Sequence, residues 1–309
     1  EELGDQNNTN STGGTGVRAL FFAGSTPSYQ NIIQYVTIPT LGNAQDFGDT
    51  LAAKASNTAL SNSVRGVSGG GYSPGTTDVI EFVTIASTGN AADFGNLTVG
   101  RAQLSSLASQ TRGIFAGGYT TTSPATALNR IDYITISSAG NAVDFGDLYG
   151  AFFNTQACAS SVRGIISGGS SPSNVNTINY LTISTTGNSQ EFGDLTVIHN
   201  VAGGCSNSTR GLFGGGINPG IVSGGPTDFI TIASTGNAQD FGDLTVARGY
   251  IAAASSSTRT IFGGGLGSPN PIDTIDFMEI LSTGNAVDFG NLLGNVNAFA
   301  ACSNGHGGL

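Results

Sequence analysis

Short runs of alternating apolar and polar residues recur along the chain, and none extends over the ten or more residues that a helix needs. One representative stretch holds four of them: GIFAGG at 113–118, IDYITISS at 131–138, DFGDL at 144–148 and AFFNTQACASS at 151–161. Alternation with a period of two is typical of half-buried β-strands, and the Gly-Gly and Gly-Asn pairs between the runs are typical of tight turns. The pattern predicts an all-β chain of short antiparallel strands.

This unit of four runs is repeated six times, with 47 to 51 residues between corresponding positions. Three markers recur in phase: an arginine before the Gly-Gly run, a Gly-Asn pair, and the phenylalanine of a (D/E)FG motif. The arginines are Arg18, Arg65, Arg112, Arg163, Arg210 and Arg259. Four strands in about 50 residues make a propeller blade, whereas solenoid units of this length are mostly helical. The repeat predicts a six-bladed β-propeller with four antiparallel strands per blade.

The two ends of the chain are expected to share one blade, because an unclosed ring would leave a sheet edge exposed. Residues 18–50 would supply three strands, and the small-residue segment 294–305 the fourth, so that 18–309 forms the propeller. Residues 1–17 are polar and glycine-rich, and we expect a flexible lead or a linker from an upstream segment there. The other blades are expected at 51–98, 99–148, 149–195, 196–245 and 246–293.

Charged residues are few, and most of them belong to the repeat. The net charge of −10 disfavours binding to a phosphate backbone, so we expect no nucleic-acid partner. No apolar run approaches the roughly 18 residues of a membrane span, so we expect no membrane insertion. The repeat arginines and the (D/E)FG acids should lie at one end of the blades, where we favour a repeated ion pair or capped turn over metal or ligand sites. The acids are Asp46, Asp93, Asp144, Glu191, Asp240 and Asp288.

No catalytic or metal-binding constellation is recognisable, so we expect no enzyme activity, metal or cofactor. His199 and His306 have no companion at a metal-ligand spacing, and His199 takes an inner-strand position that holds Arg or Lys in other repeats, which predicts a residue on the channel rim. Three cysteines occupy one repeat position where other copies carry Leu or Ala, which indicates buried structural thiols. They are Cys158, Cys205 and Cys302.

The unit resembles a Kelch repeat, in which an apolar strand ending in Gly-Gly precedes an aromatic-bearing strand and an aromatic residue before a turn. Phe145 stands where Kelch repeats usually carry Trp. The repeat phrases at Thr231–Arg248 and Ser257–Gly265 also resemble repeats of virion structural proteins of tailed phages, notably those that infect marine cyanobacteria. The resemblance covers residues 18–305. It implies a structural or fibre component with other virion proteins as partners, located on the virion surface or extracellularly.

The loops that follow the Gly-Gly pairs vary in length and sequence while the rest repeats. Each contains proline, which lowers the entropy lost on binding, and all six should leave one face of the propeller. The loops are 25–31, 71–78, 119–130, 170–177, 217–228 and 266–273. We expect them to bind a host-surface glycan or receptor, with tyrosines offering stacking faces to a sugar. The alternatives are a purely structural decoration or assembly module and, less favoured, a polysaccharide-active enzyme. The candidate ligand contacts are Tyr29, Tyr72, Tyr119, Arg130 and Asn218.

Overall fold

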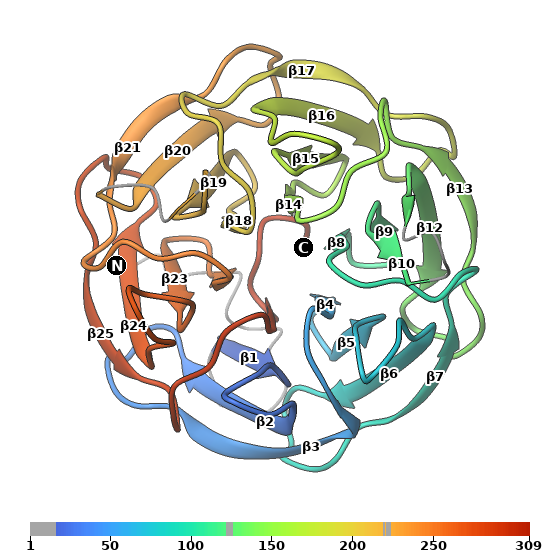
Figure 1. Cartoon of the computed structure of the whole chain (residues 1–309), viewed down its shortest axis with the longest axis horizontal. Coiled ribbons are helices and arrows are strands. Elements are labelled where there is room, and N and C mark those ends of the chain that lie inside the picture. The colour runs from blue at the N-terminus through green and yellow to red at the C-terminus, as the bar shows by residue number, and fades with distance from the viewer. Residues whose placement is uncertain (1–16, 122–125, 219, 221–223) are drawn as a thin grey trace, which may run out of the picture.

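The computed structural model describes residues 17–121, 126–218, 220 and 224–309. In these ranges the chain forms six four-stranded antiparallel sheets arranged around one axis, which confirms the six-bladed propeller (Figure 1). A further two-stranded hairpin, β10 (Tyr119–Thr120) and β11 (Thr126–Ala127), projects from the third blade. None of the described residues belongs to a helix that could span a membrane.

Blades 2 to 6 are each built from consecutive stretches of the chain, and the first strand of each blade lies nearest the axis (Figure 1). The strands of blades 2 and 3 are β4 (Thr58–Ser61), β5 (Arg65–Gly69), β6 (Val79–Thr84), β7 (Ala92–Asn96), β8 (Ser105–Ala108), β9 (Arg112–Ala116), β12 (Arg130–Thr135) and β13 (Val143–Asp147). Those of blades 4 to 6 are β14 (Gln156–Ala159), β15 (Arg163–Ser167), β16 (Thr177–Thr182), β17 (Gln190–Asp194), β18 (Gly203–Ser206), β19 (Arg210–Gly214), β20 (Pro226–Thr231), β21 (Gln239–Asp243), β22 (Ala252–Ser255), β23 (Arg259–Gly263), β24 (Thr274–Glu279) and β25 (Val287–Asn291).

Blade 1 joins the two ends of the chain, as the composition of the C-terminal segment predicted. Its sheet has the order β26 (Ala300–Ser303), β1 (Arg18–Phe22), β2 (Gln30–Thr37) and β3 (Gln45–Lys54). Strands β26 and β1 pair antiparallel, with Leu20 opposite Cys302. The ring therefore closes with three strands from one end and one from the other. Of the predicted lead, residues 1–16 lie outside the described residues.

The hydrophobic core lies between neighbouring blades. In the first of six clusters, Phe21 of blade 1 packs with Ile261 and Phe289 of blade 6. The three cysteines are free and buried within these clusters, as predicted. Burial raises the pKa of the Cys302 thiol to about 12, so the thiol stays protonated and behaves as a small apolar group.

The repeat arginines lie at the same end of the blades as the (D/E)FG acids, but the predicted ion pairs between them are wrong. Each guanidinium lies 4.4–4.6 Å from the centre of an aromatic ring of its own blade. Each also donates to a backbone carbonyl of the next blade; Arg112 Nη1, for example, lies 2.9 Å from Ile183 O. All six motif acids are exposed. Among the described residues, only Arg259 of these arginines forms an ion pair, and its partner is Glu279. The arginines thus join blades through carbonyls and ring faces.

The Gly-Asn pairs also join blades, and they do not form the tight turn that the sequence predicted. That turn precedes them, as shown by the Ser138 N to Thr135 O hydrogen bond of 3.1 Å. Asn141 Oδ1 instead accepts a 3.0 Å hydrogen bond from the backbone N–H of Asn96 in the preceding blade. Equivalent bonds occur at every blade boundary. Gly95, which directly precedes Asn96, must be glycine at this contact, because a Cβ on it (φ +143°) would lie 2.4 Å from Gly140 O.

Candidate binding site at the channel mouth

A closed ring of backbone hydrogen bonds surrounds one end of the central channel. Shortly before each inner strand, one residue has a φ of 51–58°. Its N–H donates to the carbonyl oxygen of the equivalent residue in the preceding blade, at 2.6–3.2 Å. We call these residues the mouth ring: Ser56, Gln103, Asn154, Val201, Tyr250 and Ala298.

None of the mouth-ring residues is glycine, although a side chain disfavours this left-handed conformation. The cost is greatest at Val201, because its β-branched side chain is the most restricted. Such conformations persist where the surrounding structure over-determines them, and they cluster at ligand sites. The side chains of the ring differ in every blade while the neighbouring inner strands repeat. The ring therefore combines a fixed backbone with variable chemistry.

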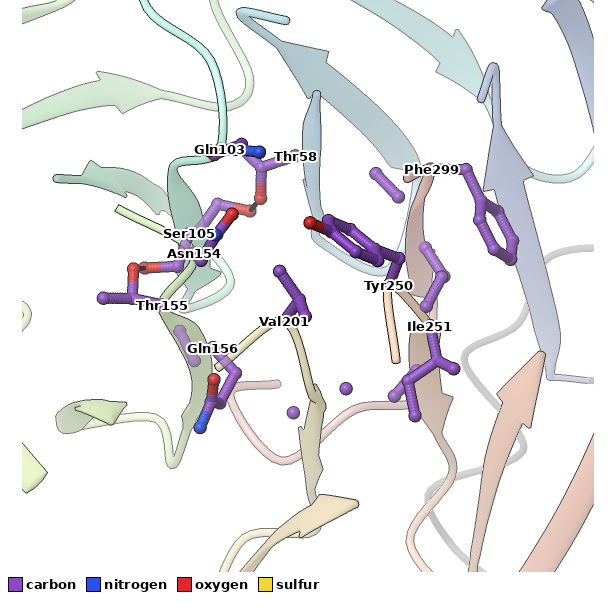
Figure 2. Close-up of a pocket in the computed structure, with 18 of the residues that line it drawn as sticks. Thr58, Gln103, Ser105, Asn154, Thr155, Gln156, Val201, Tyr250, Ile251 and Phe299 are labelled. Atoms are coloured by element: carbon purple, nitrogen blue, oxygen red, sulfur yellow. Dashed lines mark hydrogen bonds between the residues drawn. The ribbon is translucent and has the colours of Figure 1, made fainter. Parts of the chain in front are cut away.

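A cavity of about 130 Å³ lies within the ring and between the first residues of the inner strands. Figure 2 shows the side chains of Asn154, Val201 and Tyr250 converging on this space from different blades. No Lys, Arg, His, Asp or Glu is among the described residues that line it. The cavity is therefore suited to an uncharged ligand.

Aromatic residues stand beside the ring over four consecutive blades. Tyr29, Tyr72 and Tyr119 belong to loops that the sequence singled out, whereas Phe153 directly precedes the mouth-ring residue Asn154. The ring centres of Tyr29 and Tyr72 are 6.0 Å apart, and those of Tyr119 and Phe153 are 5.8 Å apart. We call these four residues the aromatic arc. Burial raises the pKa of the Tyr119 phenol, and the nearby phenols of Tyr72, Tyr29 and Tyr250 raise it further. The arc thus lies close to the mouth ring.

All six loops meet this end of the channel, which we call the loop face. A residue directly after each Gly-Gly position bridges to the residue that precedes the mouth ring, as Tyr72 does to Ala55 and Tyr119 to Ala102. Of the predicted contacts, Tyr29, Tyr72 and Tyr119 come together in the arc.

The other two predicted contacts lie apart from the arc. Asn218 accepts a hydrogen bond of 3.2 Å from Asn174 Nδ2 on the loops of blades 4 and 5. Arg130, at the start of β12, donates to Thr98 Oγ1 at 3.1 Å. Neither residue lines the cavity. Sequence reasoning missed the mouth ring itself. The signal available was one variable residue immediately before each small-residue inner strand.

The inner-strand position of His199 does not lie on the channel rim, so that prediction is wrong. In three blades this position holds a cation buried inside the blade and paired with an acid of the third strand. The pairs are Lys54–Glu81 (2.6 Å), Arg101–Asp132 (3.1 Å) and Arg248–Asp276 (2.9 Å). In the two blades with an apolar residue here, the acid is replaced by an amide: Phe152 with Asn179 and Val296 with Gln34. This covariation between repeats could have identified the pairs from the sequence.

His199 is the exception to this pairing. It is only 1% exposed, and neither ring nitrogen has a hydrogen-bond partner among the described residues. The corresponding acid, Asp228, accepts bonds from the backbone N–H and hydroxyl of Thr196. Burial lowers the pKa of His199 to about 4. The imidazole is therefore neutral at pH 7, where Arg101 and Arg248 would be charged.

We expect His199 to make the protein acid-sensitive. Its folded pKa is below the unfolded value of 6.5, so the unfolded state takes up a proton first as the pH falls, and stability is lost between pH 6.5 and about 4. The loss attributable to this residue should be about 3 kcal/mol. His199→Phe, which copies the residue of blade 4, removes the titration. Urea unfolding of both proteins at pH 7 and pH 4 measures it. An equal pH dependence in the two proteins would contradict this assignment.

The far end of the channel is crossed by residues 304–309, which places the C-terminus near the axis (Figure 1). His306 Nε2 lies 2.7 Å from Ser61 O, and Gly308 N–H donates to His306 Nδ1 at 3.0 Å, which defines the neutral Nε2–H tautomer. Gly307 N–H donates to Ser206 O at 2.8 Å. This segment thus ties together inner strands β4 and β18, and a ligand would approach the channel from the loop face.

Serine hydroxyls form a second set of links between inner strands at this end. Each donates to a backbone carbonyl of the preceding inner strand, at Ser206, Ser255, Ser303 and Ser61. Blades 3 and 4 carry Ala108 and Ala159 instead, and the crossing segment lies against their carbonyls. A Cβ on Gly308 would lie 1.8 Å from Ala108 O, and one on Gly307 would lie 2.6 Å from Ala159 O. Only glycine fits at these two positions.

Comparisons with known proteins assign the chain to no family. No protein-family model matches the chain, and no curated protein matches it in sequence. Among the described residues, no three His, Cys, Asp or Glu side chains are placed to hold a metal ion together.

Proposed function

We propose that this propeller is a non-enzymatic binding module that recognises a glycan, or a glycan-bearing receptor, through its loop face. The observation that carries the proposal is the aromatic arc beside an uncharged cavity. Aromatic rings offer apolar faces on which the C–H face of a sugar can stack, while their hydroxyls and nearby amides can hydrogen-bond to sugar hydroxyls. A rigid scaffold with proline-containing loops also keeps the entropic cost of binding low.

We further propose that the module acts on a virion surface or tail fibre, with other virion proteins as partners. This part rests on the resemblance of the repeat to phage virion proteins. A closed ring joined at every boundary by Asn and Arg contacts suits a display role, because it holds the loop face rigid under load.

A glycan array probed with multivalent, labelled protein tests the binding function. We expect binding to a subset of glycans, and a loss of about fivefold or more in affinity for Tyr72→Ala, since one aromatic contact contributes on the order of 1 kcal/mol. Tyr149→Ala is the matched control, because Tyr149 is 74% exposed and, among the described residues, its ring does not pair with a ring of the arc. The control should bind like the wild type.

Two outcomes would overturn the proposal. Failure to bind any glycan at high avidity would favour a purely structural decoration or assembly module. Release of shortened products from a bound polysaccharide would instead make the protein an enzyme.

A further inference from the structure

The mouth ring is divided into a polar half and an apolar half. Blades 2, 3 and 4 contribute Ser56, Gln103 and Asn154, whereas blades 5, 6 and 1 contribute Val201, Tyr250 and Ala298. The first residues of the inner strands continue this division below the ring. Thr58, Ser105 and Gln156 line the cavity on the polar side, and Gly203, Ala252 and Ala300 line it on the apolar side. At the next position Ser106 is the one polar residue, and the other five blades carry Ala or Gly. A ligand at the mouth would therefore meet an amide-rich wall and, across from it, an aliphatic and aromatic wall.

The polar groups that remain free on these walls can be identified. Ser106 Oγ is not free: it donates a hydrogen bond to Ala59 O at 2.8 Å and forms another with Thr58 Oγ1 at 2.7 Å. In the part of the chain that the structure describes, the side chains of Gln103, Asn154 and Tyr250 form no hydrogen bond. Three lining residues also have buried amide atoms without a partner there: Asn154 Oδ1, Asn57 Oδ1, and both Oε1 and Nε2 of Gln156. A buried carbonyl without a donor is costly, so these oxygens favour a ligand that brings an N–H or O–H group. Figure 2 shows Asn154 and Tyr250 on opposite sides of the same space.

We infer that the mouth cavity binds a neutral sugar unit that carries a methyl group, with its hydrogen-bonding groups on the Gln103–Asn154 side and its methyl against Val201. The inference rests on the proposed glycan-binding function and names the class of sugar. An acetamido group and a 6-deoxy carbon share this chemistry, because each sets a methyl beside groups that can pair with an amide. An acidic sugar would find no counter-charge among the lining residues.

Two pairs of free sugars test the inference by ligand-observed NMR titration of the wild-type protein. The pairs are N-acetyl-D-glucosamine against D-glucose, and D-fucose (6-deoxy-D-galactose) against D-galactose. We expect the methyl-bearing member of at least one pair to bind about fourfold more tightly or better, the gain from burying one methyl-sized group. Saturation transfer from the protein should be strongest on the methyl protons of that sugar. The pair that shows this difference tells whether the methyl group recognised belongs to an acetamido group or to a 6-deoxy carbon.

Two variants locate the effect, and each copies a residue that the mouth ring already holds in another blade. Val201→Ser copies Ser56 and should abolish the preference for the methyl-bearing sugar. Asn154→Ala copies Ala298 and should weaken binding of both members of the pair by about three- to tenfold. Since Ser56 and Ala298 have the same left-handed backbone conformation, neither change should disturb the fold. A thermal melt of each variant checks this.

The outcomes separate this inference from the function on which it rests. Equal affinity within both pairs, with Val201→Ser and Asn154→Ala binding like the wild type while Tyr72→Ala still loses glycan binding, would overturn the inference alone. Absence of binding to every sugar and every arrayed glycan would overturn both.

Discussion

A protein that ends before β26 should fail to form a closed, monomeric propeller. Without this strand, β1 loses its antiparallel partner along the axis, and the neighbouring inner strands β4 and β22 lose a packing surface. Buried Cys302 and Ala300 also leave the core cluster around Leu20 and Phe22. A loss on this scale is comparable with the whole stability of a domain, about 5–15 kcal/mol. Size-exclusion chromatography and thermal unfolding measure the effect, and we expect aggregation or a lost cooperative transition.

Removal of only residues 305–309 is the matched control. This shorter deletion keeps β26 and its pairing with β1 but removes His306 and the two glycines that cross the channel. We expect a folded monomer that is less stable than the full chain by a few hydrogen bonds, about 1–3 kcal/mol. If the chain without β26 were instead monomeric and as stable as the full chain, closure by β26 would not hold the ring together.

Among single substitutions, loss of one member of a buried ion pair should lower the free energy of unfolding the most. Arg101→Val leaves the Asp132 carboxylate fully buried without a counter-charge, which should cost about 3–5 kcal/mol. Adding Asp132→Gln copies the combination of Val296 and Gln34 in blade 1. We expect the double variant to recover most of the loss, because an amide can be buried more cheaply than a charge.

The glutamine can also keep the second contact of the acid. Asp132 accepts a hydrogen bond from the backbone N–H of Thr98, and Gln34 accepts the corresponding bond from Leu293 at 2.8 Å. Urea unfolding of the wild type, both single variants and the double variant forms a double-mutant cycle. A double variant as unstable as the sum of the two single variants would show that the blades do not exchange these pairs.

The sequence predicted the architecture well because each blade repeats the same pattern of residues along the chain. Six copies of the arginine, Gly-Asn and (D/E)FG markers establish the period. The small residues of 294–305 identify the closing strand. Contacts that cross between blades were predicted less well. The arginines and the motif acids do share one end of the blades. Spacing along the chain, however, cannot show that Arg112 reaches Ile183 of the next blade and leaves Asp144 in solvent.

The residues of the candidate site were likewise predicted only in part. Tyr29, Tyr72 and Tyr119 were predicted together because they occupy the same kind of loop on one face, and the structure gathers them in the arc. The mouth ring was not predicted, since its members are six different residues and none is the glycine that usually marks a left-handed conformation. Arg130 ends one of the same loops in the sequence, yet its side chain donates a hydrogen bond to Thr98.

By itself, the sequence determined the number of blades, the four strands in each, the closing strand and the buried thiols, because these follow from periodicity and side-chain size. Only the tertiary structure decided which residues face the channel, which cations are buried, and how His306 and two glycines cross its far end. The reason is physical: the hydrogen bonds of the mouth ring and the links between inner strands join positions about 50 residues apart, and 242 residues apart where Ser61 meets Ser303. Those contacts exist only once all six blades surround one axis.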